Sequence, residues 1–452
     1  MKKLLSMIFL FLFITSVQSQ NITRKAFFGI KLIEVTDSIK TALNMQSKSG
    51  LVVTAITPNS TGDKAGLKVN DVIEFLNLNN IRLDKIKDYK DAVKNYREKM
   101  PVIFSIIRNG ESLTLTTDAV PLPYEKSDKY NVIYDEVKFK EGYLRIITTR
   151  PKVPGKLKTI FFIPGYMCYS LDNIGKHPYG QVVDKLSEKG YCVVRVEKPG
   201  MGDCYNTPDC FDINYSTELE AFETGFQKML EYDFVDKENV FVFGHSLGGY
   251  EAPMVDKNRI AKGVIACGTG LKTWYEYIID MFRFQNPIAG VDYIENEKVV
   301  TDMVKVLYEI LVLKKAPADL IVSDDVKAEM KEHLEFDGGV QIWSRNYKFW
   351  QELQDLNMAE VWKNVKANVL IIRGEGDFEA FSNKDHEDIV KIVNTYHPGN
   401  ARFLLIPNMD HGFATSKTPE ESFVNKSKPG YYYNNFNDAI INEISNWIEN
   451  LK

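Results

Sequence analysis

The sequence predicts an α/β protein built on a largely parallel sheet, preceded by a small, mainly-β domain. From about residue 130 to residue 452, strand-like apolar runs alternate with helical stretches, which is the pattern of a sheet covered by helices on both faces. Residues 24–120 instead show short strand-like runs separated by turns, with one helical stretch at 87–97. The Pro- and charge-containing segment 121–131 is suited to a linker between these two regions.

The composition excludes several classes of protein. The chain has 452 residues, of which 44% are hydrophobic, and a formal net charge of -5. This apolar fraction is ordinary for a globular protein, so it argues against wholesale disorder, collagen-like repeats and a multi-span membrane protein. A mildly acidic surface offers little to phosphate groups, and we therefore expect no nucleic-acid partner.

The first 19 residues have the layout of a secretory signal peptide. They read MKKLLSMIFLFLFITSVQS, in which two lysines precede a short apolar run and then small or polar residues. An uncleaved membrane anchor is the alternative, but the apolar run is shorter than the roughly 20 residues needed to span a bilayer. No later stretch is long and apolar enough to be a transmembrane segment. We expect an exported protein, periplasmic or extracellular.

Export makes disulfides possible, and the chain has five cysteines. Only Cys204 and Cys210 lie close together in an evident loop, GDCYNTPDCFD, so the sequence predicts a disulfide between them. Two free thiols are the alternative. The cysteine spacings do not resemble a zinc site, and we expect neither a metal nor another cofactor.

The first region carries a recognisable succession of elements. A strand at 51–56 leads to a proline turn and a short helix, and the run AGLKVNDVIEFL then opens another strand. Two further strands flank an Asn109-Gly110 hairpin turn. Over about 95 residues this succession resembles a PDZ domain, of the variety found in bacterial exported proteases.

This resemblance implies a binding loop and a partner. The carboxylate-binding loop would be formed by Phe27, Phe28, Gly29 and Ile30, ahead of the strand that such domains offer to a ligand. An exposed strand edge pairs with an extended peptide, while loop N–H groups capture its terminal carboxylate. We therefore expect a peptide or protein C-terminus as a possible partner. The alternative is a module that serves only as a spacer or docking surface.

The most specific motif of the second region is a strand that runs directly into G-x-S-x-G. The apolar run 240–243 is followed by Gly244-His245-Ser246-Leu247-Gly248. A serine on a sharp strand-to-helix turn keeps its hydroxyl exposed, and the two glycines leave room for that turn. The following helix aims its first N–H groups at developing negative charge. We predict that Ser246 is a nucleophile and that the Leu247 N–H is one oxyanion donor.

A nucleophilic serine needs a base, and the base needs an orienting acid. His411 follows the apolar strand 402–406 in the loop PNMDHGF, where it can reach a serine at the carboxyl edge of the sheet. Asp377 ends the turn after the strand 369–373 and is the predicted acid. The alternatives to Asp377 are Glu375, Glu379 and Asp385. Asp410 is expected to be a solvated or loop-bonding residue.

The second oxyanion donor is expected in the loop after an early central strand. The strand 158–163 is followed by Pro164-Gly165-Tyr166-Met167. The Tyr166 N–H is the predicted donor and the Met167 N–H is the alternative; a plain turn is also possible.

Taken in order, strand–PGY, strand–RVEKPGMGD, strand–GHSLGG, strand–RGEGD and strand–NMDHGF resemble the α/β-hydrolase superfamily. The resemblance covers about 320 residues and implies an α/β-hydrolase domain at 132–452. It implies acyl transfer to water without a metal, through an acyl-enzyme. The roughly 100 residues between Cys267 and Asn368 predict a helical cap at about 269–366. Its first aromatic and apolar residues could be pocket wall or cap core: Trp274, Tyr275, Tyr277, Met281 and Phe282.

Three functions follow as hypotheses. The leading one is a secreted serine hydrolase that cleaves ester or small amide bonds of a small-molecule substrate. The second is a serine peptidase whose PDZ-like domain recruits peptide C-termini. The third is a binding protein that retains the hydrolase domain only as a scaffold.

Overall fold

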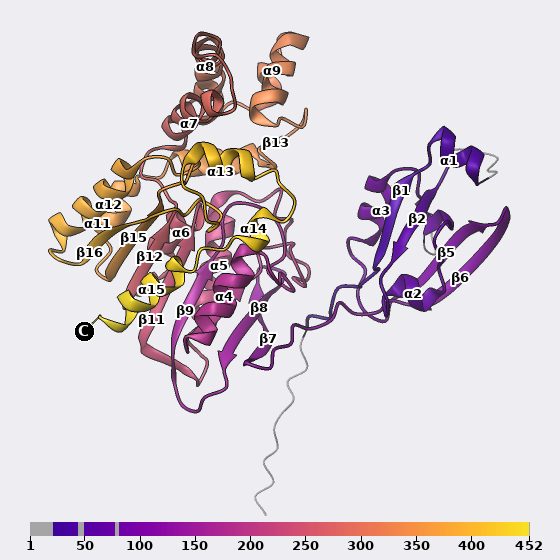
Figure 1. The fold of residues 1–452 in the computed structure, drawn as a ribbon, viewed down its shortest axis with the longest axis horizontal. Helices are drawn as coiled ribbons and strands as arrows, with labels where there is room; N and C mark the ends of the chain where they lie inside the picture. The colour runs from indigo at the N-terminus through magenta and orange to yellow at the C-terminus, as the bar shows by residue number, and fades with distance from the viewer. Residues whose placement is uncertain (1–20, 44–48, 77–80, 452) are drawn as a thin grey trace, which may run out of the picture.

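The described residues form a small and a large β-sheet, each with its own helices, and a further two-stranded sheet at 341–346. The structure is a computed structural model that describes residues 21–43, 49–76 and 81–451, so the predicted signal peptide lies outside the described residues. Figure 1 shows the small sheet and the large sheet in two bodies joined by extended chain. Together they confirm the predicted fold class, a small mainly-β domain ahead of an α/β domain.

The small sheet is antiparallel throughout and has the order β1-β2-β3-β5-β6, with β4 paired to β3. Asn109 and Gly110, both at positive φ, form the hairpin turn between β5 and β6, as the Asn-Gly pair predicts. The elements of this domain are β1 (Ile30–Glu34), α1 (Asp37–Ala42), β2 (Leu51–Ile56), α2 (Thr61–Ala65), β3 (Val72–Leu76), β4 (Ile81–Arg82), α3 (Ile86–Val93), β5 (Pro101–Arg108) and β6 (Glu111–Asp118).

The large sheet has eight strands in the order β16-β15-β12-β11-β9-β10-β8-β7. Strand β8 is antiparallel to both of its neighbours, β7 and β10. The other six strands of this sheet run parallel to one another: β10, β9, β11, β12, β15 and β16. Chain order and spatial order differ only by the exchange of β9 and β10, which is the strand order of the α/β-hydrolase fold. The strands are β7 (Tyr130–Phe139), β8 (Gly142–Pro151), β9 (Leu157–Ile163), β10 (Cys192–Val196), β11 (Val235–His245), β12 (Gly263–Cys267), β15 (Asn368–Gly374) and β16 (Ala401–Ile406).

Helices cover both faces of this sheet because its central strands are apolar on both sides. In β9, Ile160 and Phe162 face one buried cluster with α4 (Pro178–Glu188) and α15 (Ala439–Glu449). Phe161 and Ile163 face the other cluster, with α5 (Tyr215–Met229), α6 (Gly248–Val255) and α12 (Asn383–Tyr396). All four of these β9 side chains are fully buried, so the sheet forms the rigid centre of the domain.

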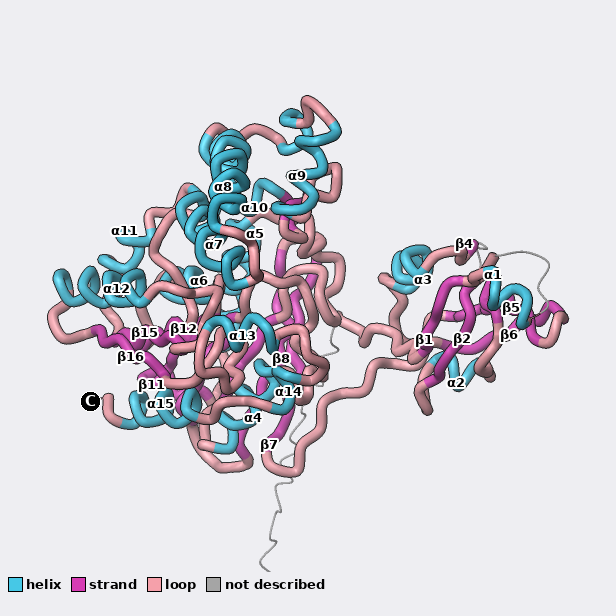
Figure 2. Tube along the Cα trace, turned by 45° about the horizontal axis from the view of Figure 1, so that its top comes forward, coloured by secondary structure: helices cyan, strands magenta, loops and turns pink. Residues whose placement is uncertain are grey.

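A mainly helical insertion separates β12 from β15, where the sequence predicts a cap. Figure 2 shows α7, α8 and α9 together at one end of the large domain. The insertion contains α7 (Trp274–Ile288), α8 (Tyr293–Leu307), a π-helical turn (Tyr308–Val312), a 3-10 turn (Pro317–Leu320), α9 (Asp324–Leu334), β13 (Gln341–Ile342), β14 (Arg345–Asn346), α10 (Tyr347–Gln354) and α11 (Met358–Lys363). Across the described ranges, no helix combines the length and apolarity that a bilayer crossing requires.

The disulfide differs from the predicted pair. Cys210 is bonded to Cys168, 42 residues earlier in the chain, while Cys204 is a free, buried thiol. The residue after Cys204 forms a β-bridge with Tyr143, which turns Cys204 under β8, where its Sγ accepts a hydrogen bond from the Arg145 N–H. Sequence proximity within the 204–210 loop therefore indicated the wrong partner, because the loop folds onto two different neighbours.

Candidate active site

The carboxyl ends of the parallel strands place the predicted residues at one edge of the large sheet. Ser246 follows β11 and stands at φ 56°, a left-handed conformation that is strained for a residue with a side chain. A methyl group at Gly244 would lie 2.0 Å from the Gly248 carbonyl oxygen, so glycine is required for the turn. The Ser246 N–H donates to the Cys267 carbonyl at 2.9 Å, which ties this turn to the end of β12.

Asp377 and His411 lie in the loops that follow β15 and β16. His411 Nδ1 is 2.9 Å from Asp377 Oδ2, and the buried Asp377 also accepts N–H bonds from Glu379 and Ala380, at 2.8 Å each. Burial alone would raise the pKa of Asp377, but the imidazole of His411 outweighs it and lowers that pKa to about 2. The carboxylate is thus fixed in position and in charge.

His411 Nε2 faces a second carboxylate, at 3.3 Å from Glu379 Oε2. Burial lowers the pKa of His411, but the carboxylates of Asp377 and Glu379 together raise it to about 10. Glu379, an alternative for the acid in the sequence, therefore lies on the nitrogen opposite the one that Asp377 holds. Glu375 contacts the Asn408 N–H instead. Asp410 is buried and accepts bonds from Ala414, Ser422 and Tyr431, so it is loop-bonding and not solvated.

Ser246 and His411 line the same cavity, whose volume is about 510 Å³. The Ser246 hydroxyl has no hydrogen-bond partner within the described part of the chain. Aromatic rings form much of the wall, and Glu379, Lys426 and Lys428 contribute charged groups. The ring residues are Tyr166, Tyr169, His177, Tyr179, Tyr431, Tyr432 and Tyr433.

The aromatic start of the insertion forms core and is not part of this wall. Trp274 stacks on Trp350 with ring centroids 4.7 Å apart, and Phe282 is 4% exposed. Part of the cavity wall comes instead from residues 426–433, a segment that contains glycine and lysine and has no periodicity that would identify it as pocket.

The loop after β9 lies directly against Ser246. A methyl group at Gly165 would be 3.2 Å from Ser246 Cβ and 3.6 Å from its Oγ. Tyr166 and Met167 line the cavity beside it. Among the described residues, neither the Tyr166 N–H nor the Leu247 N–H has an acceptor, so both remain available to a ligand atom.

His245 and Tyr179 connect three parts of the site, a role that no sequence pattern indicates. The Gly165 N–H donates to the Tyr179 hydroxyl at 3.0 Å, the hydroxyl lies 2.7 Å from His245 Nδ1, and His245 Nε2 lies 2.8 Å from the His411 carbonyl oxygen. A carbonyl can only accept, so Nε2 carries the hydrogen and Nδ1 accepts from the hydroxyl. Burial and the nearby His411 lower the pKa of His245 to about 3, which keeps the ring neutral.

Gly268, at the end of β12, is a second residue that the sequence analysis did not single out. It stands at φ 61°, and a methyl group there would lie 3.1 Å from both Cε1 and Nδ1 of His411 and 3.3 Å from Asp377 Oδ2. The glycine therefore leaves the space that the His411–Asp377 pair occupies. Its position directly after a buried strand of the same parallel sheet is the one sequence feature that indicates a place near the site.

The predicted peptide-binding loop has structural contacts within the small domain. Phe28 is buried, with edge-on contacts to Tyr89, Tyr96 and Phe104. Gly29 is at φ 61°, and a methyl group there would overlap Ser60 Cβ at 2.2 Å. Phe27 accepts an N–H bond from Thr61, and Ile30 begins the edge strand β1. Peptide binding at this edge stays a prediction.

No group of His, Cys, Asp and Glu residues suited to hold a metal ion occurs among the residues described. The site's own groups are therefore a serine hydroxyl, a His–Asp pair, unpaired backbone N–H groups and one further carboxylate. Their chemistry suits nucleophilic attack on a carbonyl with proton transfer.

Comparisons with known proteins find two sequence relatives of low identity. No protein-family model matches the sequence. Esterase EstD of Thermotoga maritima is 22% identical over 98% of each chain. Serine endoprotease DegS of Haemophilus influenzae is 27% identical over 97 residues, 22% of this chain and 28% of that one.

Solved structures with similar coordinates cover about three quarters of this chain. Est1E from Butyrivibrio proteoclasticus is 16% identical, with a TM-score of 0.43, over 70% of this chain and 97% of that chain. An acylaminoacyl peptidase from Pyrococcus horikoshii is 15% identical, with a TM-score of 0.42, over 78% and 47%. The strand order of the large sheet and the similarity to Esterase EstD along almost the whole chain together support the α/β-hydrolase superfamily.

Proposed function

We propose that the protein is a serine hydrolase that cleaves ester or small amide bonds through an acyl-enzyme on Ser246. One observation carries the proposal: the strained Ser246 opens into the same cavity as His411, whose Nδ1 is bonded to the buried Asp377. The resemblance of the whole chain to an esterase supports an ester substrate over an amide.

In the first half-reaction, Ser246 Oγ attacks the substrate carbonyl and its proton passes to His411 Nε2. Glu379 has to leave Nε2 for this transfer, because Asp377 and Glu379 together raise the pKa of His411 and so favour the charged imidazole, which cannot accept a proton. The Tyr166 and Leu247 N–H groups bind the oxyanion. The alcohol or amine leaves with the proton from Nε2.

In the second half-reaction, water attacks the acyl-enzyme and gives a proton to His411. The tetrahedral species then collapses, Ser246 recovers its proton, and the carboxylic acid leaves. Asp377 holds the imidazole in the orientation and tautomer that serve both halves.

Hydrolysis of nitrophenyl esters and nitroanilides by the purified protein tests the proposal. We expect esters to be cleaved, and we expect Ser246→Ala and His411→Ala each to lower kcat by about 10⁴-fold or more. His397→Ala is the matched control, because His397 bonds the Lys363 carbonyl away from the cavity. Full activity in Ser246→Ala would overturn the assignment. A wild-type protein that cleaves nothing, yet binds a ligand, would support the binding-protein hypothesis.

We also infer that the protein is exported. The Cys168–Cys210 disulfide supports an oxidising compartment, as does the signal-like start of the sequence. Fractionation of cells that express the full chain tests this inference, and a mature protein found only in the cytoplasm, with both thiols reduced, would contradict it.

A further inference from the structure

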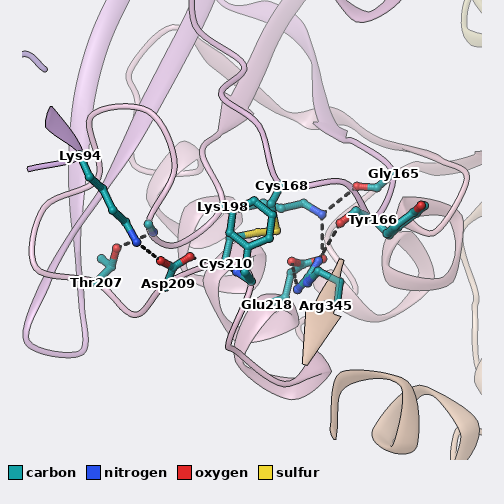
Figure 3. The surroundings of a disulfide bond; sticks show 12 residues. Lys94, Gly165, Tyr166, Cys168, Lys198, Thr207, Asp209, Cys210, Glu218 and Arg345 are labelled. Atoms are coloured by element: carbon teal, nitrogen blue, oxygen red, sulfur yellow. Dashed lines mark hydrogen bonds and ion pairs between the residues drawn. A yellow bond between two sulfur atoms is a disulfide. The ribbon is translucent and has the colours of Figure 1, made fainter. Parts of the chain in front are cut away.

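A buried cluster of charged side chains lies directly beneath the Pro164–Met167 loop. It consists of Lys198, after β10; Glu218, in α5; and Arg345, in β14 of the insertion. Their side chains are at most 2% exposed. Figure 3 shows the three side chains converging on the loop beside the Cys168–Cys210 disulfide. None of the three residues lines the cavity that Ser246 and His411 share.

Both cations donate to carbonyl groups of the loop. Lys198 Nζ is 2.7 Å from the Gly165 carbonyl oxygen, and Arg345 Nη1 is 2.7 Å from the Tyr166 carbonyl oxygen. Glu218 joins the two cations, with one carboxylate oxygen 2.9 Å from Lys198 Nζ and the other 2.8 Å from Arg345 Nη2. Two consecutive peptide units are thus held from the same side (Figure 3).

Because a trans peptide unit is planar, a contact that fixes its carbonyl also fixes the direction of its N–H group. The C=O of one residue and the N–H of the next point in opposite directions within one peptide unit. When Lys198 holds the Gly165 carbonyl, the Tyr166 N–H points away from the cluster, and when Arg345 holds the Tyr166 carbonyl, the Met167 N–H does so. Gly165, whose carbonyl Lys198 holds, is also the residue of this loop that lies against Ser246, since a methyl group there would be 3.2 Å from Ser246 Cβ.

A further buried carboxyl group, that of Glu251, lies close to the cluster. Both of its oxygens are unpartnered among the described residues. Burial and the charge of Glu218 raise the pKa of Glu251 well above its ordinary value, and burial lowers the pKa of Lys198, which the carboxylate of Glu218 opposes. A cation on a carbonyl oxygen polarises its amide and strengthens the N–H as a donor.

Stability alone is a weak reason for such a cluster. Removing charged groups from water costs several kcal/mol per ion, and packed apolar side chains of similar volume often stabilise a fold equally well. The contacts of Lys198 and Arg345 with two consecutive carbonyls instead fix the orientation of two peptide units. The orientation they fix is that of the backbone N–H groups next to Ser246.

We propose that Lys198 and Arg345, bridged by Glu218, are positioning residues that orient and polarise the peptide units of the oxyanion loop. This inference rests on the proposed hydrolase function. Because Arg345 belongs to the insertion between β12 and β15, the insertion completes the oxyanion site in addition to covering the domain. The sequence offers no motif for this role, since the three residues come from unrelated segments.

The test compares Lys198→Met, Arg345→Met and Arg345→Lys with wild type in the full chain. We expect both Met variants to lower kcat by about 10- to 100-fold, with KM changed by less than about threefold. Arg345→Lys keeps the charge but cannot hold Glu218 and the Tyr166 carbonyl as a fork, so we expect a smaller loss. Arg108→Met is the matched control, because it removes a bidentate arginine from the buried Asp71 in the small domain.

The affinity for a trifluoromethyl ketone shows whether a variant has lost the orientation of the oxyanion site or only the stability of the fold. This probe adds to the serine and places an oxyanion in the loop, so its inhibition constant should rise by the same factor by which kcat/KM falls. Unchanged kcat and unchanged ketone affinity in Lys198→Met and Arg345→Met would overturn the proposal. If a Met variant does not fold, Arg345→Lys decides: a lower kcat at an unchanged Tm supports the proposal, and an unchanged kcat overturns it. A wild type that neither cleaves esters nor binds the ketone would instead refute the proposed function.

Discussion

A methyl group added at Gly268 should disable the site through a steric effect that can be calculated from the structure. In Gly268→Ala the new carbon would lie 3.1 Å from His411 Cε1 and Nδ1, whereas ordinary contact begins at about 3.5 Å. His411 therefore has to move by about 0.4 Å, close to the 0.5 Å tolerance of catalytic geometry. We expect kcat/KM to fall by about 10- to 100-fold. The left-handed backbone adds about 1–2 kcal/mol of lost unfolding free energy.

Gly399→Ala is the control that separates these two effects. Gly399 also stands at positive φ, 83°, but a methyl group there meets nothing within 4 Å. Both variants should lose a similar unfolding free energy in urea titrations, and only Gly268→Ala should lose ester hydrolysis in steady-state kinetics. Wild-type kcat/KM in Gly268→Ala, or an equal loss in Gly399→Ala, would refute the reasoning.

Three further predictions concern the groups around this pair. Glu379→Gln removes one of the carboxylates that raise the pKa of His411. Activity requires the neutral imidazole of His411, so kcat/KM rises with pH through that pKa. We expect the rising limb of the kcat/KM profile to move about one pH unit lower in this variant. A limb at the same pH as in wild type would contradict this role of Glu379. Tyr179→Phe leaves the Gly165 N–H without its acceptor and should lower kcat by about tenfold. Tyr191→Phe is the control, because the Tyr191 hydroxyl bonds Ser445 and Glu449 instead, and it should leave kcat unchanged. Cys168→Ser removes the disulfide and should lower the unfolding free energy by about 2–4 kcal/mol, whereas Cys204→Ser should leave the Cys168–Cys210 bond intact. A Cys204–Cys210 cross-link in a non-reduced digest of the wild type would disprove this pairing.

The fold could be predicted because local patterns and global topology agree. Buried parallel strands are continuous apolar runs, as at 158–163 and 369–373, and each is followed by a loop that carries a predicted site residue. The strand-to-helix turn at Ser246 is encoded locally by its two glycines. His411 and Asp377 follow from the rule that the ends of parallel strands meet at one edge.

Contacts between distant segments could not be predicted in this way. Cys210 is bonded to Cys168, which directly follows the Pro164–Met167 loop, and nothing in the spacing of the cysteines encodes that contact. The contact of Glu379 with His411 Nε2 depends on the course of the turn after Asp377. The cavity wall at 426–433 likewise becomes visible only in three dimensions.

Covalent labelling tests the central claim most directly. A fluorophosphonate probe reacts with a serine only when a base removes its proton and N–H donors stabilise the product, so it reports the assembled site independently of any substrate. The proposed mechanism predicts one adduct per chain, located on Ser246 by mass spectrometry of the digest, and no adduct in Ser246→Ala. Equal labelling of wild type and Ser246→Ala, or an adduct on a different serine, would contradict it.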